Sequence, residues 1–235
     1  MPENGEILRI SGGDGALFHA INAPEYRLQP IELTPSGRGN ALARDLARRA
    51  DGSTFIPIDL IETTIRPASG DSYIRRCASS VAFGNPSEVT RIAERLRVLG
   101  RLSYAAAGLL TLPKAIRLEI AYDGAPLELK TLKGVHINNT RHAGGFTAIR
   151  EAQLDDGLID VLELNAGYLS QTAHNFSEVT GLGLWRPARH VQIRQATIRA
   201  EAPSMLMLDG ELVSGIVAVE LKVLPGALRI RLAEC

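Results

Sequence analysis

The chain opens with a short apolar run, a glycine-rich loop and a segment suited to a helix. Residues 6–10 are mostly apolar and predict a strand. Residues 11–15, Ser-Gly-Gly-Asp-Gly, interrupt this run, and residues 16–23 can form a helix. This order predicts a strand, a tight loop and a helix in succession.

A second unit of the same kind follows. Residues 29–33 predict another short strand, and residues 34–39 form a loop rich in glycine. Asn40 can cap a helix that ends near Arg49. Two such units predict a parallel α/β layer whose ligand loops lie at the carboxyl ends of the strands. Two strands make only a small sheet, so we expect this layer to be incomplete.

Beyond residue 56 the spacing of apolar residues becomes mostly that of strands. Helical spacing persists at residues 87–99, 104–112 and 170–179, and Asp123-Gly124 is typical of a hairpin turn. The strand-like runs are residues 115–122, 126–132, 134–138, 159–164, 191–200, 204–208, 216–223 and 228–232. We therefore predict an α/β domain over residues 1–57 and a β-sandwich with flanking helices over residues 58–235.

Composition narrows the classes of function. The 26 Lys and Arg residues balance 26 Asp and Glu, which argues against a bulk electrostatic grip on nucleic acid, and an aromatic content of 5% makes a base-stacking platform improbable. No apolar run approaches the ~20 residues that a membrane-spanning helix needs. The beginning of the sequence lacks the pattern of a signal peptide, and Cys77 and Cys235 cannot make a disulfide framework. We expect a cytoplasmic protein whose membrane contact is peripheral.

The first candidate motif is the loop Gly12-Gly13-Asp14-Gly15. Glycines let the backbone approach a phosphate closely, and the start of a helix offers unpaired N–H groups. A carboxylate there can hold Mg²⁺ or take a proton from an attacking hydroxyl. The alternative is a tight turn in which Asp14 only caps the helix.

The second candidate motif is Ser36-Gly37-Arg38-Gly39-Asn40. It has neither the third glycine of a dinucleotide-binding loop nor the Gly-Lys-Ser/Thr of a P-loop. Arg38 could neutralise a phosphate or be solvated. The plain alternative is a flexible loop with an asparagine cap.

Two acidic motifs lie further along. Residues 155–160, Asp-Asp-Gly-Leu-Ile-Asp, can bind a hard cation together with backbone carbonyls, although a solvated turn is the commoner meaning of such spacing. Asp209-Gly210-Glu211 by itself predicts only a hairpin turn, as Asp123-Gly124 does. The five histidines show no zinc-binding spacing, and no Gly-x-Ser-x-Gly elbow is present.

Taken together, the motifs resemble the diacylglycerol kinase and sphingosine kinase superfamily of lipid kinases, over almost the whole chain. The resemblance rests on the order of Ser11-Gly-Gly-Asp-Gly15, Pro35-Ser-Gly-Arg-Gly-Asn-Ala-Leu-Ala-Arg44, Leu99-Gly-Arg-Leu-Ser-Tyr104, Gly144-Gly145, Asp155-Asp-Gly-Leu-Ile-Asp160 and Leu208-Asp-Gly-Glu211. It implies an N-terminal nucleotide-binding domain like that of NAD and diacylglycerol kinases. It also implies a β-sandwich that holds a lipid, with catalysis between the two.

The resemblance also implies roles for individual residues. Asp14 and Glu211 would be the catalytic carboxylates, and Asp156 with the carbonyl of Leu158 would bind Mg²⁺. The residues implied to bind ATP are Gly12, Gly13, Asp14, Gly15, Ala16, Gly37, Arg38, Gly39 and Asn40.

Several positions depart from the family pattern. The family's first strand and its phosphate loop are not found in the sequence. Ala16, Arg38 and Ala41 stand where a threonine, a threonine or serine, and an aspartate are usual, and His19 replaces a glutamate. The string Gly-Asn-Ala-Leu-Ala resembles the sphingosine kinase branch and favours a long-chain base or ceramide-like acceptor.

Three interpretations remain open at this point. The first is a lipid kinase that uses ATP and Mg²⁺ on diacylglycerol, ceramide or a sphingoid base at a membrane surface. The second is a non-catalytic lipid-binding relative, and the third is a kinase of another small hydroxylated molecule. An exposed edge of the short sheet would favour pairing with a second copy of the chain.

Overall fold

The N-terminal layer has the predicted strand–loop–helix units. The computed structural model describes residues 6–26, 28–37, 39–49, 54–112, 114–143, 146–165 and 188–233. Strands β1 and β2 are parallel, with Leu8 opposite Ile31. The elements of this N-terminal layer are β1 (Leu8–Gly12), α1 (Asp14–Ile21), β2 (Ile31–Pro35) and α2 (Ala41–Arg49). The predicted parallel pairing is confirmed.

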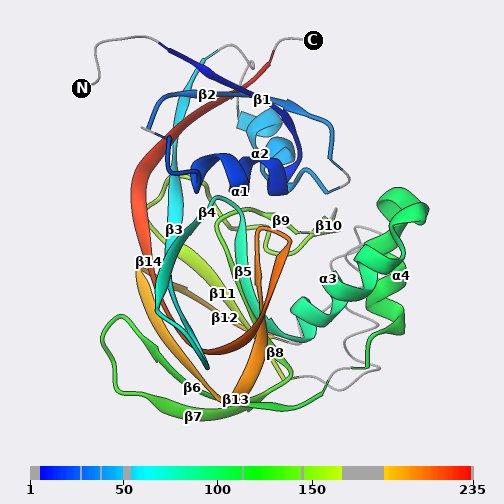
Figure 1. Ribbon diagram of the computed structural model, residues 1–235, viewed down its shortest axis with the longest axis vertical. Helices are drawn as coiled ribbons and strands as arrows, with labels where there is room; N and C mark the ends of the chain where they lie inside the picture. The colour runs from blue at the N-terminus through cyan, green and yellow to red at the C-terminus, as the bar shows by residue number, and fades with distance from the viewer. Residues whose placement is uncertain are drawn as a thin grey trace.

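The last strand of the described residues joins this layer beside β2. Strand β14 (Glu211–Leu232) runs along the molecule from the sandwich to the N-terminal layer (Figure 1). Near its end, Ile230 lies opposite Ile31 of β2 in parallel register and opposite Ile56 of β3 (Ile56–Pro67) in antiparallel register. One mixed sheet therefore links the first and last segments of the chain.

The remaining strands form the sandwich-like body. Strand β13 (Gln195–Leu208) is antiparallel to β14, β5 and β6, and β5 continues through β8 and β11 to β12. Besides β13 and β14, the strands of this body are β4 (Tyr73–Cys77), β5 (Ser80–Gly84), β6 (Ile116–Tyr122), β7 (Glu128–Leu132), β8 (Gly134–Asn138), β11 (Ile159–Leu164) and β12 (Ala188–Ile193). A separate small pair joins β9 (His142–Ala143) and β10 (Phe146–Thr147).

Helices at the side of the sandwich form a projecting hairpin (Figure 1). They are α3 (Asn85–Arg95), the 3₁₀ segment η1 (Arg97–Leu102) and α4 (Ser103–Leu110). Gly100, inside η1, has φ of 56°, a left-handed conformation that glycine adopts without steric cost. The chain can therefore turn sharply between α3 and α4. No helix within the described part of the chain is long and apolar enough to cross a bilayer.

Two large apolar clusters stabilise these parts. The sandwich cluster is centred on Phe83, which is fully buried, and on β-branched residues such as Val135 and Ile198. The second cluster joins Leu17 of α1 and Leu42 of α2 to side chains that follow in the sequence much later. The later contributors include Ile58, Leu60, Ala78, Leu154, Leu228 and Ile230. The first 57 residues thus share their core with β3 and β14.

Comparison with the sequence predictions shows one systematic omission. The strands β3, β4 and β5 were not predicted, because their apolar residues do not alternate in the simple way of a half-buried strand. Both predicted Asp-Gly hairpins are confirmed: Asp123 and Asp209 each have φ of 49°. The helix predicted at residues 170–179 lies outside the described residues.

Candidate active site

The two glycine-rich loops contact each other at the carboxyl ends of β1 and β2. The Ser36 N–H donates to the Gly12 carbonyl over 3.0 Å. A Cβ atom added to Gly37 would lie 2.6 Å from the Gly13 Cα, and one added to Gly12 would lie 2.3 Å from the Ala16 Cβ. These glycines are therefore required by close packing of the loops, whatever else they bind.

Asp14 holds the starts of both helices together. Its Oδ2 accepts the Ala41 N–H over 2.9 Å and its Oδ1 accepts the Leu42 N–H over 3.2 Å. Burial raises the pKa of Asp14, whereas these hydrogen bonds and the charge of Arg44 act to lower it. Asp14 thus caps α2, the neighbouring helix, a role that neither sequence interpretation contained.

The prediction that the Asn40 side chain caps α2 is wrong. Asn40 has φ of 47°, and its buried Oδ1 has no hydrogen-bond partner among the described residues. The Oδ1 instead faces the glycine loops, since a Cβ on Gly37 would lie 2.6 Å from it and one on Gly13 would lie 3.2 Å from it. Gly39 precedes it in the loop, and Arg38 lies outside the described residues.

Glu211 reaches the first glycine loop from the other end of the sequence. A Cβ atom on Gly15 would lie 3.0 Å from the Glu211 Oε1, and no other neighbour in the described part of the chain would contact it. The same Oε1 lies 3.5 Å from the His19 Nε2. The Glu211 side chain is 45% exposed, so its carboxylate meets both the start of α1 and solvent. The structure therefore brings together the two predicted catalytic loops.

Asp209 fixes the hairpin that carries Glu211. Its Oδ2 accepts the Ala78 N–H over 2.7 Å, and its Oδ1 accepts the Ser79 and Ser80 N–H groups over 2.9 and 2.8 Å. The side chain is buried. Burial raises the pKa of Asp209 to about 7 although the three N–H bonds act to lower it, and the charge of Asp14 raises it further. Sequence reasoning named this residue only as part of a turn.

The predicted cation loop lies near the end of α2, whereas the glycine loops lie near its start. The Asp156 Oδ1 accepts the Leu158 N–H over 3.0 Å, which closes a tight turn. Asp155 forms an ion pair with Arg49 at the end of α2, over 2.5 Å. Among the described residues, no three His, Cys, Asp or Glu side chains are grouped to hold a metal ion. A cation here would therefore depend on Asp156 and backbone carbonyls.

Two further carboxylates surround this loop and feel its charge. The Asp59 Oδ2 accepts the Gly157 N–H and its Oδ1 accepts the Gly226 N–H, both over 2.7 Å. Asp160 lies 2.6 Å from the His190 Nε2. Burial is the main cause that raises the pKa of Asp59 and of Asp160, and the negative charge of Asp156 adds to both shifts. A bound cation would relieve this repulsion.

A buried aspartate–histidine pair is a feature that the sequence did not predict. Asp45 of α2 lies 2.6 Å from the His142 Nδ1 and accepts the Arg141 N–H over 2.6 Å. Asp45 is 5% exposed. The pair attaches α2 to the segment before Gly144 and Gly145, two motif residues that lie outside the described part of the chain. No local sequence signal joins Asp45 to His142.

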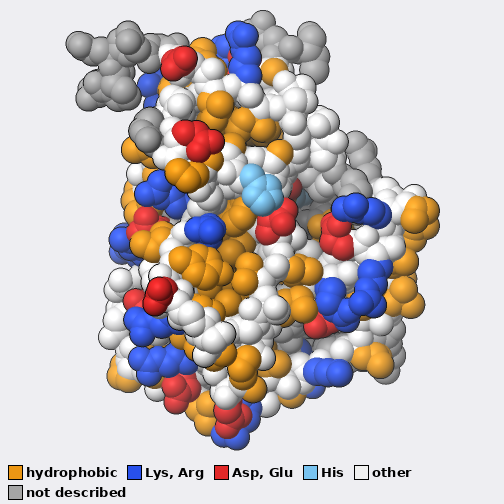
Figure 2. Space-filling model, viewed as in Figure 1, with side chains coloured by type: hydrophobic (Ala, Val, Ile, Leu, Met, Phe, Trp, Pro, Cys, Tyr) orange, Lys and Arg blue, Asp and Glu red, His pale blue; other side chains and the backbone are white. Residues whose placement is uncertain are grey.

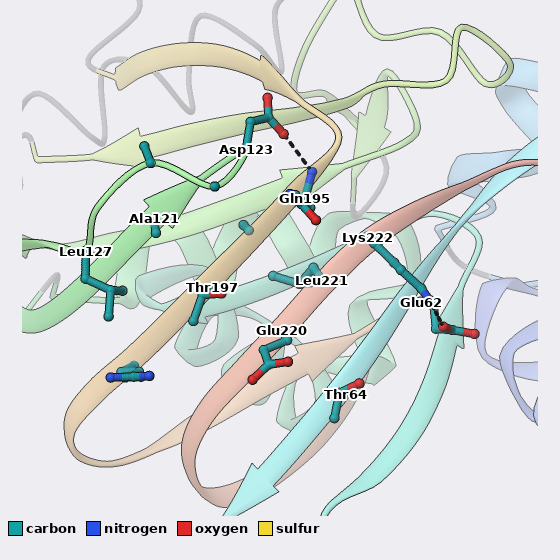
Figure 3. A pocket seen from close by; sticks show the side chains of 14 residues that line it. Glu62, Thr64, Ala121, Asp123, Leu127, Gln195, Thr197, Glu220, Leu221 and Lys222 are labelled. Carbon is teal, nitrogen blue, oxygen red and sulfur yellow. Dashed lines mark hydrogen bonds and ion pairs between the residues drawn. The ribbon is translucent and has the colours of Figure 1, made fainter.

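An open groove of about 550 Å³ lies on another face of the sandwich (Figure 3). Strands β3, β6, β13 and β14 line it with charges of both signs. Lys222 forms an ion pair with Glu62 over 2.9 Å at one side, and Asp123 accepts the Gln195 N–H at the other. The groove shares no residue with the glycine loops or with Glu211, and its charges are largely paired.

The arrangement around Glu211 suits phosphoryl transfer. The N-cap residue of α1, Gly13, has no side chain to cover the start of this helix, although the Asp14 carboxylate already accepts the Asp14 N–H in the first turn, so an anion can approach the N–H groups that follow. Gly15 leaves space in front of the Glu211 carboxylate, which can accept a proton. An acidic group and an anion-binding helix end therefore face the same space.

Comparison with protein families identifies the second part of the chain. Residues 79–232 match the family model described as the YegS C-terminal NAD kinase beta sandwich-like domain. A protein of Stenotrophomonas maltophilia named "Probable lipid kinase YegS-like" is 26% identical over 97% of this chain and 79% of its own length. A diacylglycerol kinase of Mycobacterium tuberculosis is 24% identical over 96% of this chain and 76% of its own length.

Solved structures show the same fold. A crystal structure of a diacylglycerol kinase from Bacillus anthracis has a TM-score of 0.72 at 21% identity, covering 96% of this chain and 77% of that chain. Yeast NADH kinase, solved with NADH, has a TM-score of 0.56 at 13% identity, over 97% of this chain and 62% of that chain. The predicted fold class, a kinase-like α/β layer with a β-sandwich, is confirmed.

Proposed function

This chain belongs to the family of the YegS C-terminal NAD kinase beta sandwich-like domain, whose relatives are named as kinases, and we propose that it is an ATP-dependent lipid kinase. The proposed reaction transfers the γ-phosphoryl group of ATP to the hydroxyl of a diacylglycerol, ceramide or sphingoid base. The Gly-Asn-Ala-Leu-Ala string, residues 39–43, favours the long-chain base or ceramide.

The position of Glu211 carries the proposal. Its carboxylate lies against Gly15 at the start of α1, although the two residues belong to opposite ends of the chain. A hydroxyl is a poor nucleophile, and a carboxylate placed beside an anion-binding helix end can accept its proton as it attacks phosphorus. If Glu211 were only a solvated turn residue, its contact with the loop of Gly15 would not be expected.

In the proposed reaction, the lipid hydroxyl oxygen forms a bond to the γ-phosphorus, and the bond from that phosphorus to the bridging oxygen of ADP breaks. The hydroxyl proton passes to Glu211. The N–H groups in the first turn of α1 attract the phosphoryl charge, while Asp14 holds the starts of α1 and α2 in fixed relation through its bonds to Ala41 and Leu42. Asp14 is thus a positioning residue in this geometry.

Oxygen donors suit Mg²⁺, and we assign Asp156 and the Leu158 carbonyl as the groups that would hold it. The closed turn at Leu158 and the raised pKa values of Asp59 and Asp160 nearby support a cation at this loop. When bound there, the ion would supply charge neutralisation that keeps the loop folded. No proton transfer by Glu211 depends on it.

The test is transfer of labelled phosphate from ATP to a panel of dispersed lipids: diacylglycerol, ceramide, sphingoid base and monoacylglycerol. Glu211→Gln should lower kcat by about 10²- to 10⁴-fold, the range of a lost general base, without loss of folding. Glu220→Gln is the matched control, because Glu220 lies on the same strand and its side chain is 48% exposed against 45% for Glu211. Equal activity of the two variants would refute the role of Glu211.

One observation favours the second function, a non-catalytic lipid-binding relative. Both carboxylate oxygens of Asp14 are occupied by backbone N–H groups, so Asp14 is poorly placed to act as a base. This function predicts binding of a lipid without transfer of phosphate from ATP. Calorimetric titration of the full chain with ATP and Mg²⁺ separates the two, since only the kinase must bind the nucleotide.

A further inference from the structure

Large exposed apolar side chains are concentrated in the helical hairpin. We call residues 95–117 the helical arm. Within it Val98 is 87% exposed, Leu110 63% and Leu112 70%. Leu99 and Leu109 are also exposed, so five of the nine large exposed apolar side chains among the described residues lie in this one segment. A concentration of this kind marks an interaction surface more than scattered exposure does.

The packing of α4 explains which face is exposed. Ser103, Ala107 and Thr111 recur every fourth residue and are buried, and the Thr111 hydroxyl donates to the Ala107 carbonyl over 2.7 Å. Ser103 and Ala107 thus mark the buried face of α4, a helix that contacts α3, and Thr111 continues this face just beyond the helix. The helix contains no charged residue, and Leu109 and Leu110 at its carboxyl end are 48% and 63% exposed.

The charge of the arm has one sign. No acidic residue occurs between Glu94 and Glu119, whereas the same stretch contains Arg95, Arg97, Arg101, Lys114 and Arg117. Arg97 pairs with Glu94 and Arg117 with Glu201. Arg95 and Lys114 are exposed, and neither has an acidic partner within ion-pair distance among the described residues. Basic and hydrophobic side chains lie together over α3 and α4 in Figure 2.

We propose that the helical arm docks on an anionic lipid surface, with its leucines entering the interface and its basic residues meeting the headgroups. Exposed apolar residues next to basic residues are the pattern of an interfacial segment. The charge complementarity selects a lipid bilayer over an apolar protein partner. The inference rests on the proposed function, because a kinase of a membrane lipid must reach its acceptor at the bilayer.

The test is cosedimentation of the full chain with vesicles of phosphatidylcholine alone or mixed with phosphatidylglycerol. Leu109→Ser/Leu110→Ser should weaken binding to the mixed vesicles by about 10-fold or more, because two apolar side chains no longer enter the interface. Arg95→Gln/Lys114→Gln should weaken it by about 5-fold for each charge, and only on the anionic vesicles. Added salt should reduce this second difference.

A matched control comes from the β6–β7 hairpin. Leu127 and Leu129 are 38% and 56% exposed but lie beside Glu128, so Leu127→Ser/Leu129→Ser should leave vesicle binding unchanged. Equal loss in both double variants would overturn the proposal. So would a drop in the unfolding midpoint of Leu109→Ser/Leu110→Ser, which would mean that these leucines pack within the chain.

Activity measurements separate this proposal from the function on which it rests. On acceptor lipid dispersed in detergent, Leu109→Ser/Leu110→Ser should retain the activity of the unmodified chain and lose it only on vesicles. Vesicle binding without phosphate transfer to any lipid would refute the kinase and leave the docking surface standing. Phosphate transfer without vesicle binding would refute the docking surface alone.

Discussion

Replacing Asp209 by alanine tests how the hairpin of Glu211 is held in place. The substitution removes the acceptors of three backbone N–H groups, those of Ala78, Ser79 and Ser80, inside a buried site. Because Asp209 is buried, we expect no water to replace the lost bonds. At about 1 kcal/mol for each hydrogen bond, the free energy of unfolding should fall by about 3 kcal/mol.

The measurement is urea unfolding at pH 5, where Asp209 is protonated in the folded chain because its pKa is about 7. The cost of burying a charge is then absent, and the loss of hydrogen bonds dominates. Asp123→Ala is the control, since Asp123 also begins an Asp-Gly turn at φ of 49° and accepts the N–H groups of Arg194 and Gln195. Asp123 is exposed, so water replaces those bonds and we expect a loss below about 1 kcal/mol.

The same residue predicts the dependence of stability on pH. Its pKa is raised on folding from an ordinary value of 3.8 to about 7, so the folded chain binds more protons than the unfolded chain between these values. Stability is therefore greatest near or below the unfolded value and falls as pH rises towards 7. From pH 5 to pH 8 the loss from Asp209 alone should be about 2 to 3 kcal/mol.

The two measurements together can refute the reasoning. The difference between the unmodified chain and Asp209→Ala should shrink as pH rises from 5 to 8, because the unmodified chain loses stability that the variant never had. An equal effect of Asp209→Ala and Asp123→Ala at pH 5 would show that burial does not set the cost. A constant difference across this pH range would show that Asp209 does not titrate there.

Three further predictions concern the loops. Asp14→Asn should lower the midpoint of thermal unfolding as well as kcat, because it weakens the cap of α2 by about 1 kcal/mol; a change of kcat without a change of midpoint would argue against the capping role. Gly37→Ala should cost about 1 to 3 kcal/mol in urea unfolding, since its Cβ would lie 2.6 Å from the Gly13 Cα, and a neutral result would contradict that contact. Mg²⁺ should raise the unfolding midpoint of the unmodified chain but not that of Asp156→Ala, which calorimetry with Mg²⁺ or with a chelator would measure. An equal shift of the midpoint in both proteins would exclude a cation at Asp156.

Local sequence was sufficient for the elements of the N-terminal layer. Strands β1 and β2 and helices α1 and α2 each have a clear apolar spacing and a glycine-rich boundary, and both Asp-Gly turns were correctly placed. Strand β5 was missed because it is buried on both faces, which removes the alternation of apolar and polar residues that identifies a half-buried strand. Strands β3 and β4 are only partly buried, and polar residues interrupt their apolar residues without a regular period of two. The long β14 was predicted as separate pieces, since bulges interrupt its pairing with β3 and β13.

The candidate site was predictable only as a set of motifs. The order of the motifs indicated that Asp14 and Glu211 belong together, and the structure places Glu211 against Gly15 of the same loop. The sequence could not show that Asp14 caps α2 in place of Asn40. Asp14 and its hydrogen-bond partners Ala41 and Leu42 belong to two different strand–loop–helix units, so local sequence does not reveal that they are in contact.

A comparison of the two Asp-Gly turns shows what the sequence alone determined and what depended on the tertiary structure. Local chemistry fixed both turns, because an Asp-Gly pair adopts the left-handed conformations that a tight hairpin requires. It could not distinguish Asp123, exposed at the end of a hairpin, from Asp209, buried beneath three N–H groups of the β4–β5 connection. That difference depends on which segment packs against the carboxylate and excludes water from it, and only the folded chain brings those segments together.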